Sequence, residues 1–333
     1  MRVLRLFVLS CTFIAPGLAG CGADATQARQ SPHGATVPAV TAAPPPLQAP
    51  ITSASLTRIS GTAADDIWVV GAAGTVLHYD GKGWSLIPSG TTENLLGVWA
   101  TNPQDAWVVG DTEVVLHWDG TTWSPVVAPS TGVLIGVWGS SASDVWAVGI
   151  DEGSAFYRRW DGATWTYDWL DFAPSFWSVW GSAPDDVWAA GSAGPDSGQL
   201  IRYDGTKLNR VAFSGPQLRS IAGTSSEDVW VVAQASPMQH WNGSAWEVPS
   251  GPPITGTLFD VWAGSPSDAW ACGTNGQMLH WDGSSWTLAA LDTTLSLHGI
   301  WGNKTDDIWA VGSSGMVLHY DGRSWIPVFT PTN

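Results

Sequence analysis

Histidine recurs at one position of this chain in a pattern that could bind a metal ion. Five histidines lie two residues before an Asp or Asn, and two arginines take the same place elsewhere: His78, His117, Arg159, Arg202, His240, His280 and His319. Metal ligands must converge on one ion, whereas copies of one position in a repeated fold are spread apart. Arginine keeps a hydrogen-bond donor but offers no lone pair. We therefore predict structural donors, each to an Asp of its own repeat, and no metal site.

Aspartate is the other abundant residue that suggests chemistry. The chain has 29 Asp and Glu against 13 Lys and Arg, a formal net charge of −16. Such a surface repels phosphate backbones, which argues against a nucleic-acid ligand. Calcium is an alternative because it prefers carboxylate oxygens. Most of these acids recur in predicted turns, where Asp accepts backbone N–H groups, so turn capping is the favoured interpretation.

The sequence contains no recognisable catalytic motif. We find neither a glycine-rich phosphate-binding loop nor a Ser, His and Asp arrangement typical of a hydrolase. The sequence therefore predicts a protein without enzymatic activity and without a cofactor.

A tripeptide of Asp, an aliphatic residue and Trp marks a repeat along the chain. Its copies begin 39 to 42 residues apart, at Asp66, Asp105, Asp144, Asp186, Asp228, Asp268 and Asp307. Most copies are followed by an aromatic residue, Asp, Gly, two variable residues and Trp, as in residues 79–84. These repeats account for most of the 24 Trp residues. Seven copies of one unit of about 40 residues indicate a repeat architecture.

Each repeat contains four short segments suited to β-strands, which we name A, B, C and D. In the sixth repeat they span residues 258–262, 268–273, 277–281 and 285–289, with turn-forming residues between them. Apolar side chains on both faces of each strand fit a blade that is covered by a neighbour on either side. The sequence thus predicts an all-β, seven-bladed β-propeller with four antiparallel strands per blade over residues 51–333.

Packing between the blades follows from the pattern of strand A. A large apolar residue, a small residue and Trp alternate there, as in Leu134, Gly136 and Trp138. We expect the Trp of one blade to lie over the small residue of the next. Cys272 takes a place filled elsewhere by Val or Ala, so we expect a buried apolar side chain rather than a reactive thiol. The repeats begin with A and end with D, and how the ring closes is not visible in the sequence.

The first 20 residues have the features of a secretory signal peptide. Two arginines precede an apolar stretch that is too short to span a membrane, and Leu18-Ala19-Gly20-Cys21 follows. This ending resembles a bacterial lipobox, which implies cleavage before Cys21 and its acylation with fatty acids such as palmitate. Residues 21–50, rich in Ala and Pro, would then form a disordered, lipid-anchored linker. The alternative is an ordinary signal peptide with a chance cysteine.

Lipidation would place the protein in the bacterial cell envelope. Two or more acyl chains give stable anchoring, so a triacylated Cys21 implies attachment to a membrane. Gly22 favours the outer membrane, on its periplasmic or its outer side. We expect the anchored protein to be a monomer.

The turn motif resembles the Asp-box of BNR-repeat propellers, and runs such as residues 145–149 are similar to tectonin repeats. The chain is most similar to Trp-rich propeller lipoproteins of Gram-negative bacteria. BNR propellers include sialidases, so the resemblance raises a glycoside hydrolase as an alternative function. The Arg-Ile-Pro motif of sialidases is absent, because Ser60 follows Arg58 and Ile59. The resemblance therefore favours a fold more than an activity.

The third and fourth repeats depart most from the common pattern. Both are longer between strands B and C, and we place the added residues, 150–154 and 192–198, in or near the B–C loops. The connection from D to A between them, taken as residues 168–177, holds two Trp residues outside the repeat pattern. Irregular loops on a rigid scaffold are where binding sites usually lie. We also include two polar residues near the channel mouth, Arg219 and His298, in the candidate site. The candidate ligand-binding residues are Asp151, Glu152, Trp169, Asp171, Phe172, Trp177, Asp196, Arg219 and His298.

These features predict a non-enzymatic envelope lipoprotein whose propeller is a scaffold for binding a protein or another ligand. A carbohydrate-binding lectin is the first alternative, because Trp169 and nearby carboxylates suit stacking on a sugar ring and bonding to its hydroxyls. A BNR-type glycoside hydrolase is the second. The expected partners are a membrane, through the anchor, and a protein or glycan ligand.

Overall fold

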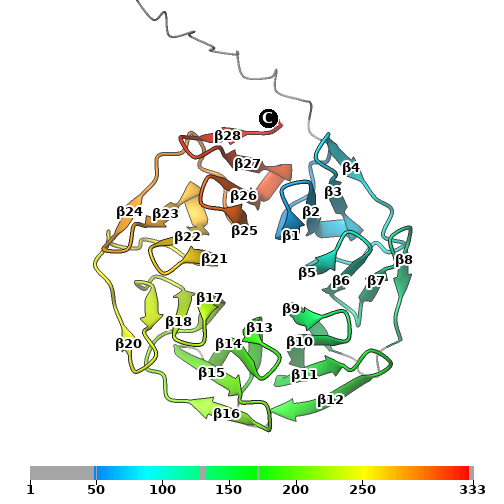
Figure 1. Ribbon diagram of the computed structural model, residues 1–333, viewed down its shortest axis with the longest axis horizontal. Coiled ribbons are helices and arrows are strands. Elements are labelled where there is room, and N and C mark those ends of the chain that lie inside the picture. Colours follow the sequence, from blue (N-terminus) through cyan, green and yellow to red (C-terminus); the bar gives the residue numbers. More distant parts are fainter. Residues whose placement is uncertain (1–48, 50, 128–131, 171–172, 195, 330–333) are drawn as a thin grey trace, which may run out of the picture. The chain divides into compact units, whose positions relative to one another are not determined.

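The chain folds into seven four-stranded antiparallel sheets arranged as blades around a central axis (Figure 1). The computed structural model describes residues 49, 51–127, 132–170, 173–194 and 196–329. Within each blade the strands pair in chain order, from the innermost strand A to the outermost strand D. The predicted fold class, a seven-bladed β-propeller, is confirmed.

The inner half of each blade consists of its two longer strands. In order around the ring, the A strands are β1 (Leu56–Ala63), β5 (Leu95–Asn102), β9 (Val133–Ser141), β13 (Ser175–Ala183), β17 (Leu218–Ser225), β21 (Leu258–Ser265) and β25 (Leu297–Lys304). The B strands are β2 (Asp66–Gly71), β6 (Asp105–Gly110), β10 (Asp144–Asp151), β14 (Asp186–Gly194), β18 (Asp228–Ala233), β22 (Asp268–Gly273) and β26 (Asp307–Gly312).

The outer half of each blade consists of shorter strands. The C strands are β3 (Val76–Tyr79), β7 (Val115–Trp118), β11 (Ser154–Trp160), β15 (Ser197–Tyr203), β19 (Gln239–Trp241), β23 (Met278–Trp281) and β27 (Val317–Tyr320). The D strands are β4 (Trp84–Leu86), β8 (Trp123–Pro125), β12 (Trp165–Leu170), β16 (Leu208–Val211), β20 (Trp246–Glu247), β24 (Trp286–Leu288) and β28 (Trp325–Pro327). Three B–C turns are single 3-10 turns, η1 (Ala72–Gly74), η2 (Thr274–Gly276) and η3 (Ser313–Gly315).

The Trp in the middle of each B strand joins its blade to the next one. The indole of Trp68 lies 5.1 Å from that of Trp118 and 5.3 Å from that of Trp123, both in the second blade. All seven of these wedge tryptophans are at most 5% exposed. The wedge tryptophans are Trp68, Trp107, Trp146, Trp188, Trp230, Trp270 and Trp309. Burial of a large aromatic side chain between sheets is the main apolar contribution of each junction.

The strand A Trp packs over a small residue of the next blade, three positions after the expected one. A Cβ atom on Gly181 would lie 2.5 Å from Cη2 of Trp138, and one on Gly139 would lie 2.8 Å from Cη2 of Trp99. The sequence pattern predicts this contact at the repeat position of Gly136. That glycine instead faces the backbone of the next A strand, because its Cβ would lie 3.1 Å from Cα of Ser178.

The predicted donors to the Asp of Asp-x-Trp are confirmed. Nε2 of His78 lies 2.8 Å from Oδ1 of Asp66, and the imidazole stacks on the wedge Trp68 at 4.0 Å between ring centroids. In the third blade Nε of Arg159 donates to Oδ1 of Asp144 at 2.7 Å. A buried carboxylate thus keeps hydrogen bonds from both kinds of donor.

Aspartates at the C–D turns cap the turns, as expected. Oδ1 of Asp282 accepts hydrogen bonds from the backbone N–H groups of Ser284 and Ser285, both at 2.9 Å, and from the Ser284 hydroxyl at 2.7 Å. These donors, the Ser284 hydroxyl first, lower the pKa of Asp282 from 3.8 to about 2. In the fifth blade Asn242 makes the same two backbone bonds.

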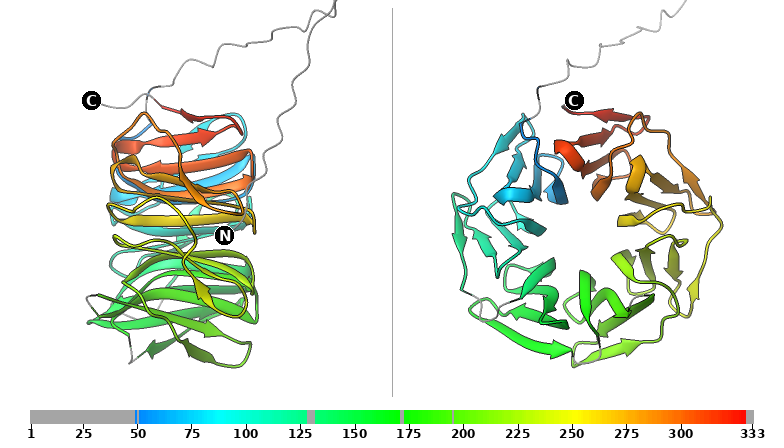
Figure 2. Two further views of the ribbon diagram at one scale, coloured as in Figure 1. Left: turned by 90° about the vertical axis from the view of Figure 1, so that its left-hand side faces the viewer. Right: turned by 180° about the vertical axis from the view of Figure 1, so that it is seen from behind.

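The ring closes between the seventh and first blades by side-chain packing, and no strand is exchanged among the described residues. Figure 2 shows the two blades, red and blue, next to each other. The wedge Trp309 lies 5.6 Å from Trp84 and 5.3 Å from Tyr79 of the first blade. Phe329, 3% exposed, joins the same cluster after the last strand. The closing junction therefore uses the same contact as the other six.

Cys272 occupies the interior of the sixth blade. Cys272 is fully buried, and this burial raises the pKa of its thiol, which confirms the apolar role.

The signal peptide, Cys21 and nearly all of the linker lie outside the described residues. Within the described part of the chain, no helix has the length and apolarity needed to cross a membrane.

The contact between Trp138 and Gly181 can be tested by adding volume. Gly181→Val should lower the free energy of unfolding by about 1–3 kcal/mol, because the new side chain overlaps the Trp138 ring. Urea denaturation followed by circular dichroism measures this loss. Gly83→Val is the matched control, since no atom lies within 4 Å of its Cβ position. Equal effects of the two substitutions would contradict the packing described.

The turn cap of Asp282 predicts a titration at low pH. Its carboxyl group should titrate near pH 2, and Ser284→Ala should move that pKa towards 3.8 by removing the hydroxyl donor. Because the folded pKa is depressed, the stabilisation by this group is complete above pH 3.8 and is lost as the pH falls towards 2. Carboxyl chemical shifts measured by NMR check the prediction, and an unchanged pKa in Ser284→Ala would contradict it.

Candidate functional site

A β-bulge in every A strand places one unpaired residue at the mouth of the central channel. In all seven blades, the pairing between strands A and B skips one residue of strand A. In the fifth blade the shift lies between Leu218 and Ser220. A bulge re-aims the side chain of its extra residue. We call these residues the mouth ring: Thr57, Leu96, Ile135, Trp177, Arg219, Phe259 and His298.

The next residue of each A strand lies beside the channel, where adjacent A strands approach each other. We call these residues the channel ring: Arg58, Gly97, Gly136, Ser178, Ser220, Asp260 and Gly299. Glycine suits this place because the next A strand is close, with Ile135 O only 2.8 Å from the Cβ position of Gly97. Charged side chains at Arg58 and Asp260 are therefore departures from the repeat that packing does not require.

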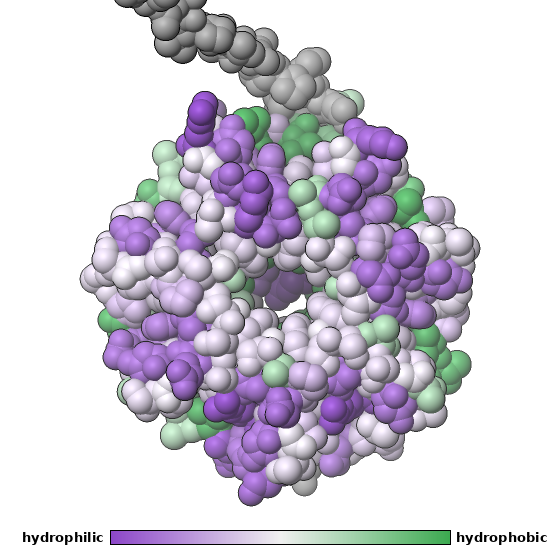
Figure 3. Space-filling view, in the orientation of Figure 1, coloured by the Kyte–Doolittle hydropathy of each residue, from purple (hydrophilic) through white to green (hydrophobic). Residues whose placement is uncertain are grey.

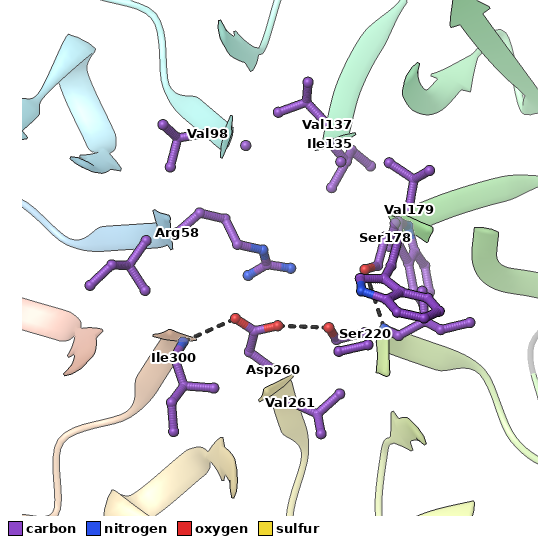
Figure 4. A pocket seen from close by; sticks show the side chains of 17 residues that line it. Arg58, Val98, Ile135, Val137, Ser178, Val179, Ser220, Asp260, Val261 and Ile300 are labelled. Carbon is purple, nitrogen blue, oxygen red and sulfur yellow. Dashed lines mark hydrogen bonds between the residues drawn. The ribbon is translucent and has the colours of Figure 1, made fainter. Parts of the chain in front are cut away.

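The channel ring, except Gly299, lines a cavity of about 140 Å³ that all seven A strands border. Figure 3 shows the opening at the centre of the ring, and Figure 4 shows the lining side chains. Typical pockets for drug-sized ligands are about 300–1,000 Å³. The cavity therefore suits a small group or one side chain of a larger partner.

Asp260 and Arg58 lie within the channel, where each is held by neighbouring blades (Figure 4). The Asp260 carboxylate accepts a hydrogen bond from the Ser220 hydroxyl at 2.6 Å and one from the Ile300 N–H at 3.0 Å. Nη1 of Arg58 donates to the carbonyl oxygens of Thr57 and His298, at 3.0 and 2.9 Å. Among the described residues, the guanidinium group is thus held through Nη1 alone.

Arg219 and Trp177 are brought together in the mouth ring. The guanidinium carbon of Arg219 lies 4.1 Å from the centroid of the Trp177 ring, a cation–π contact. Nε of Arg219 is buried and has no hydrogen-bond partner among the described residues. Burial, and to a lesser degree the charge of Arg58, lower the pKa of Arg219.

His298 completes this group and is neutral at pH 7. Its Nδ1–H donates to the carbonyl oxygen of Leu56 at 2.9 Å, and its ring meets Phe259 edge to face at 5.2 Å. Burial lowers its pKa below 6.5, and repulsion from Arg58 adds to the effect. Of the predicted site residues, Trp177, Arg219 and His298 therefore belong to one ring.

The added residues of the third blade lie near the B–C turn, as expected, but they lengthen the two strands rather than the turn. Strand β10 extends to Asp151 and β11 begins at Ser154, with only Glu152 and Gly153 in the turn. Their φ angles of 48° and 83° fit the tight turn of a two-residue hairpin. Asp151 is buried rather than on the surface, whereas Glu152 is exposed.

The fourth blade is extended in the same way. Strand β14 runs to Gly194 and β15 starts at Ser197, so these residues belong to strands and not to a long loop. Asp196 lies in the turn and is exposed.

The predicted D–A connection after the third blade is also shorter than expected. Strand β12 continues to Leu170, so Asp168 and Trp169 belong to strand D. Trp169 is 39% exposed and shares a strand face with Tyr167, which is 48% exposed. The indole of Trp169 lies 6.0 Å from the Phe156 ring. The predicted site residues Asp171 and Phe172 lie outside the described residues.

Two residues of the channel, Arg58 and Asp260, were not among the predicted site residues. The signal for both was present, since each replaces a Gly or Ser at one repeat position. Within the described ranges, no three or more His, Cys, Asp and Glu side chains are grouped so that they could hold a metal ion.

Comparison with known proteins supports the fold without naming a family. No family model matches the chain, and no curated protein matches it. Among solved structures, YCF48 from Cyanidioschyzon merolae superposes with a TM-score of 0.64 at 18% identity, over 81% of this chain and 96% of that one. A structure of YCF48 bound to D1 peptide gives 0.63 at 16%, over 82% and 93%. The WD40 propeller domain of Doa1 gives 0.66 at 13%, over 81% and 94%. At these identities the chain is similar to all three in its seven-bladed propeller fold.

Proposed function

We propose that this protein is a non-enzymatic envelope lipoprotein whose propeller binds a protein at the channel mouth. The observation that carries the proposal is the mouth ring, where seven equivalent positions hold chemically different side chains. Positions that pack blade against blade repeat closely, so the fold does not demand this variety. A similar propeller, YCF48, has been solved with a bound peptide, which supports a protein ligand for the present chain.

The composition of the mouth ring fits a protein interface. Leu96, Ile135 and Phe259 supply apolar surface, while Trp177 and Arg219 are of the types that dominate binding energy at interfaces. The bulges hold these side chains on rigid inner strands, which limits the entropy lost on binding. A partner would thus meet a preformed surface.

The carboxylates of the described residues support a binding role over catalysis. The Asp of each Asp-x-Trp is bonded to His or Arg, as Asp228 is to His240 at 2.6 Å. Asp260 already accepts two hydrogen bonds in the channel. A glycoside hydrolase needs two carboxyl groups facing one open cleft, and we therefore retain the non-enzymatic interpretation.

A lectin is the second candidate, and one observation favours it. Tyr167 and Trp169 are exposed side by side on the outer strand β12. Neighbouring aromatic rings of this kind suit stacking on the apolar face of a sugar. The two candidates use different surfaces, so substitutions separate them.

The lipid anchor predicts how the protein partitions between cell fractions. Cys21→Ala should move the full chain from the membrane fraction to the soluble fraction, because the acylated side chain is lost. Cys11→Ala, within the signal peptide, is the matched control and should leave the protein in the membrane. Retention of Cys21→Ala in the membrane would contradict lipidation at this residue.

The binding surface can be located by photo-crosslinking in cells. Full-length protein with p-benzoylphenylalanine in place of Leu96, in the mouth ring, should yield a discrete adduct with one protein. The same probe in place of Leu288, which is 63% exposed on the outer strand β24, is the control and should not yield that adduct.

Two results would count against protein binding at the mouth. One is the same set of adducts from both probe positions, or none from either. The other is binding of the full chain to one glycan on an array, lost in Trp169→Ala but kept in Leu86→Ala, which would favour the lectin instead. Leu86 is a suitable control because it is 54% exposed on the outer strand β4.

A further inference from the structure

Two arginines at the channel mouth lack acidic partners in a protein that is rich in acids. The chain carries 29 Asp and Glu against 13 Lys and Arg. Arg159, Arg202 and Lys304 each form an ion pair with an aspartate. Arg58 and Arg219 form none within the described ranges of the chain, although carboxylates are abundant. Lys82, Lys207 and Arg323 also form no ion pair, but they are exposed to solvent, whereas Arg58 and Arg219 are partly buried at the channel.

Arg58 has unused donors that face the channel. A guanidinium group offers five N–H donors in a planar fork. The two hydrogen bonds of Arg58 to protein groups both start from Nη1, and both go to backbone carbonyl oxygens. Figure 4 shows the rest of the group extending across the channel. Nε and Nη2 are therefore available to an anion.

Arg219 is positioned by stacking and leaves its edge unused. Its guanidinium carbon lies 4.1 Å from the centroid of the Trp177 ring, which holds the group against the indole. Its buried Nε has no acceptor in the described part of the protein. Because Nε has no accessible surface, an anion in the mouth would instead meet Nη1 and Nη2, which are not buried and make no hydrogen bond to the described residues. Such an anion would also offset the repulsion between Arg219 and Arg58.

The charge of the mouth selects the kind of anion. Arg58 and Arg219 contribute two positive charges, Asp260 contributes one carboxylate, and His298 is neutral at pH 7. The sum is one positive charge, which matches a monoanion better than a dianionic phosphate. Both oxygens of Asp260 already accept hydrogen bonds, so Asp260 is poorly placed to bind a cationic group instead.

We infer that the channel mouth binds a carboxylate between Arg58 and Arg219, with a small group of the same ligand in the cavity beside it. The cavity wall exposes slightly more polar than apolar surface, with Val98, Ile135 and Val179 among its apolar residues, and its volume of about 140 Å³ admits one small side chain. A free carboxylic acid and the C-terminal residue or an acidic side chain of a protein present the same chemistry. In the second case the inference rests on the proposed function and identifies what the partner offers.

The experiment measures binding of four small probes to the full chain by isothermal titration calorimetry at pH 7. N-acetyl-leucine represents a C-terminal residue, 3-methylbutanoate a free acid, and N-acetyl-glutamate α-amide an acidic side chain. N-acetyl-leucinamide has the shape of the first probe without its charge. At least one acid should bind at least tenfold more tightly than the amide, and the strongest of the three identifies the source of the carboxylate.

Substitutions test whether the two arginines bind the carboxylate. Arg58→Gln and Arg219→Gln should each weaken binding of the best probe at least tenfold. Arg323→Gln removes the same charge from an exposed turn of the seventh blade and should change nothing. Asp260→Asn raises the net charge of the mouth and should allow inorganic phosphate to bind. Thermal unfolding of each variant verifies that it is folded.

Three results would overturn the inference. They are equal binding of acid and amide, full binding in either arginine variant, or tighter binding of phosphate than of any carboxylate to the unsubstituted protein. If Leu96 crosslinks a partner while no carboxylate binds, the protein-binding proposal stands and the carboxylate inference fails. If carboxylates bind through both arginines but no partner is crosslinked, the inference stands for a free acid and the protein-binding proposal fails.

Discussion

Insertion of one tryptophan from each blade into the next is the interaction on which the rest of this structure depends. Trp68 contacts an aromatic pair of the second blade, and Trp309 makes the same contact across the closing junction. Removing a buried Trp from a core costs about 3–5 kcal/mol, more than the roughly 1–3 kcal/mol of leaving a buried polar group unpaired. The hydrogen bond from His78 to Asp66 therefore orients the wedge rather than providing most of the stability.

The regular junctions leave the inner edge of each blade free to vary. Strand A has a neighbour within its blade on one side only, and its bulge turns one residue out of the pairing. Arg219 and Thr57 can occupy equivalent positions because neither has to fill space between two sheets. Stability and recognition are in this way assigned to different residues of the same repeat.

The fold could be predicted from the sequence because it depends on features that recur, whereas the candidate site depends on features that do not. Trp, Asp and His return at fixed spacing, so their roles were visible. The bulge was not, since it occurs in every blade and changes no spacing. The added residues around Glu152 read as a loop because turn residues lie among them, but hydrogen bonding makes longer strands more favourable. Arg58 and Asp260 could have been recognised only by aligning the seven repeats and comparing the residues at one position of strand A.

The closing junction makes it arbitrary which blade comes first in the chain. Ile51, before the first strand, and Val328, after the last, pack into one cluster between the seventh and first blades. No strand of the described ranges crosses this junction, so its packing is of the same kind as that of the other six. A circular permutation that joined the two ends and opened any other D–A connection would preserve every sheet. The ring is therefore a cyclic object, and the position at which its polypeptide begins is independent of its architecture.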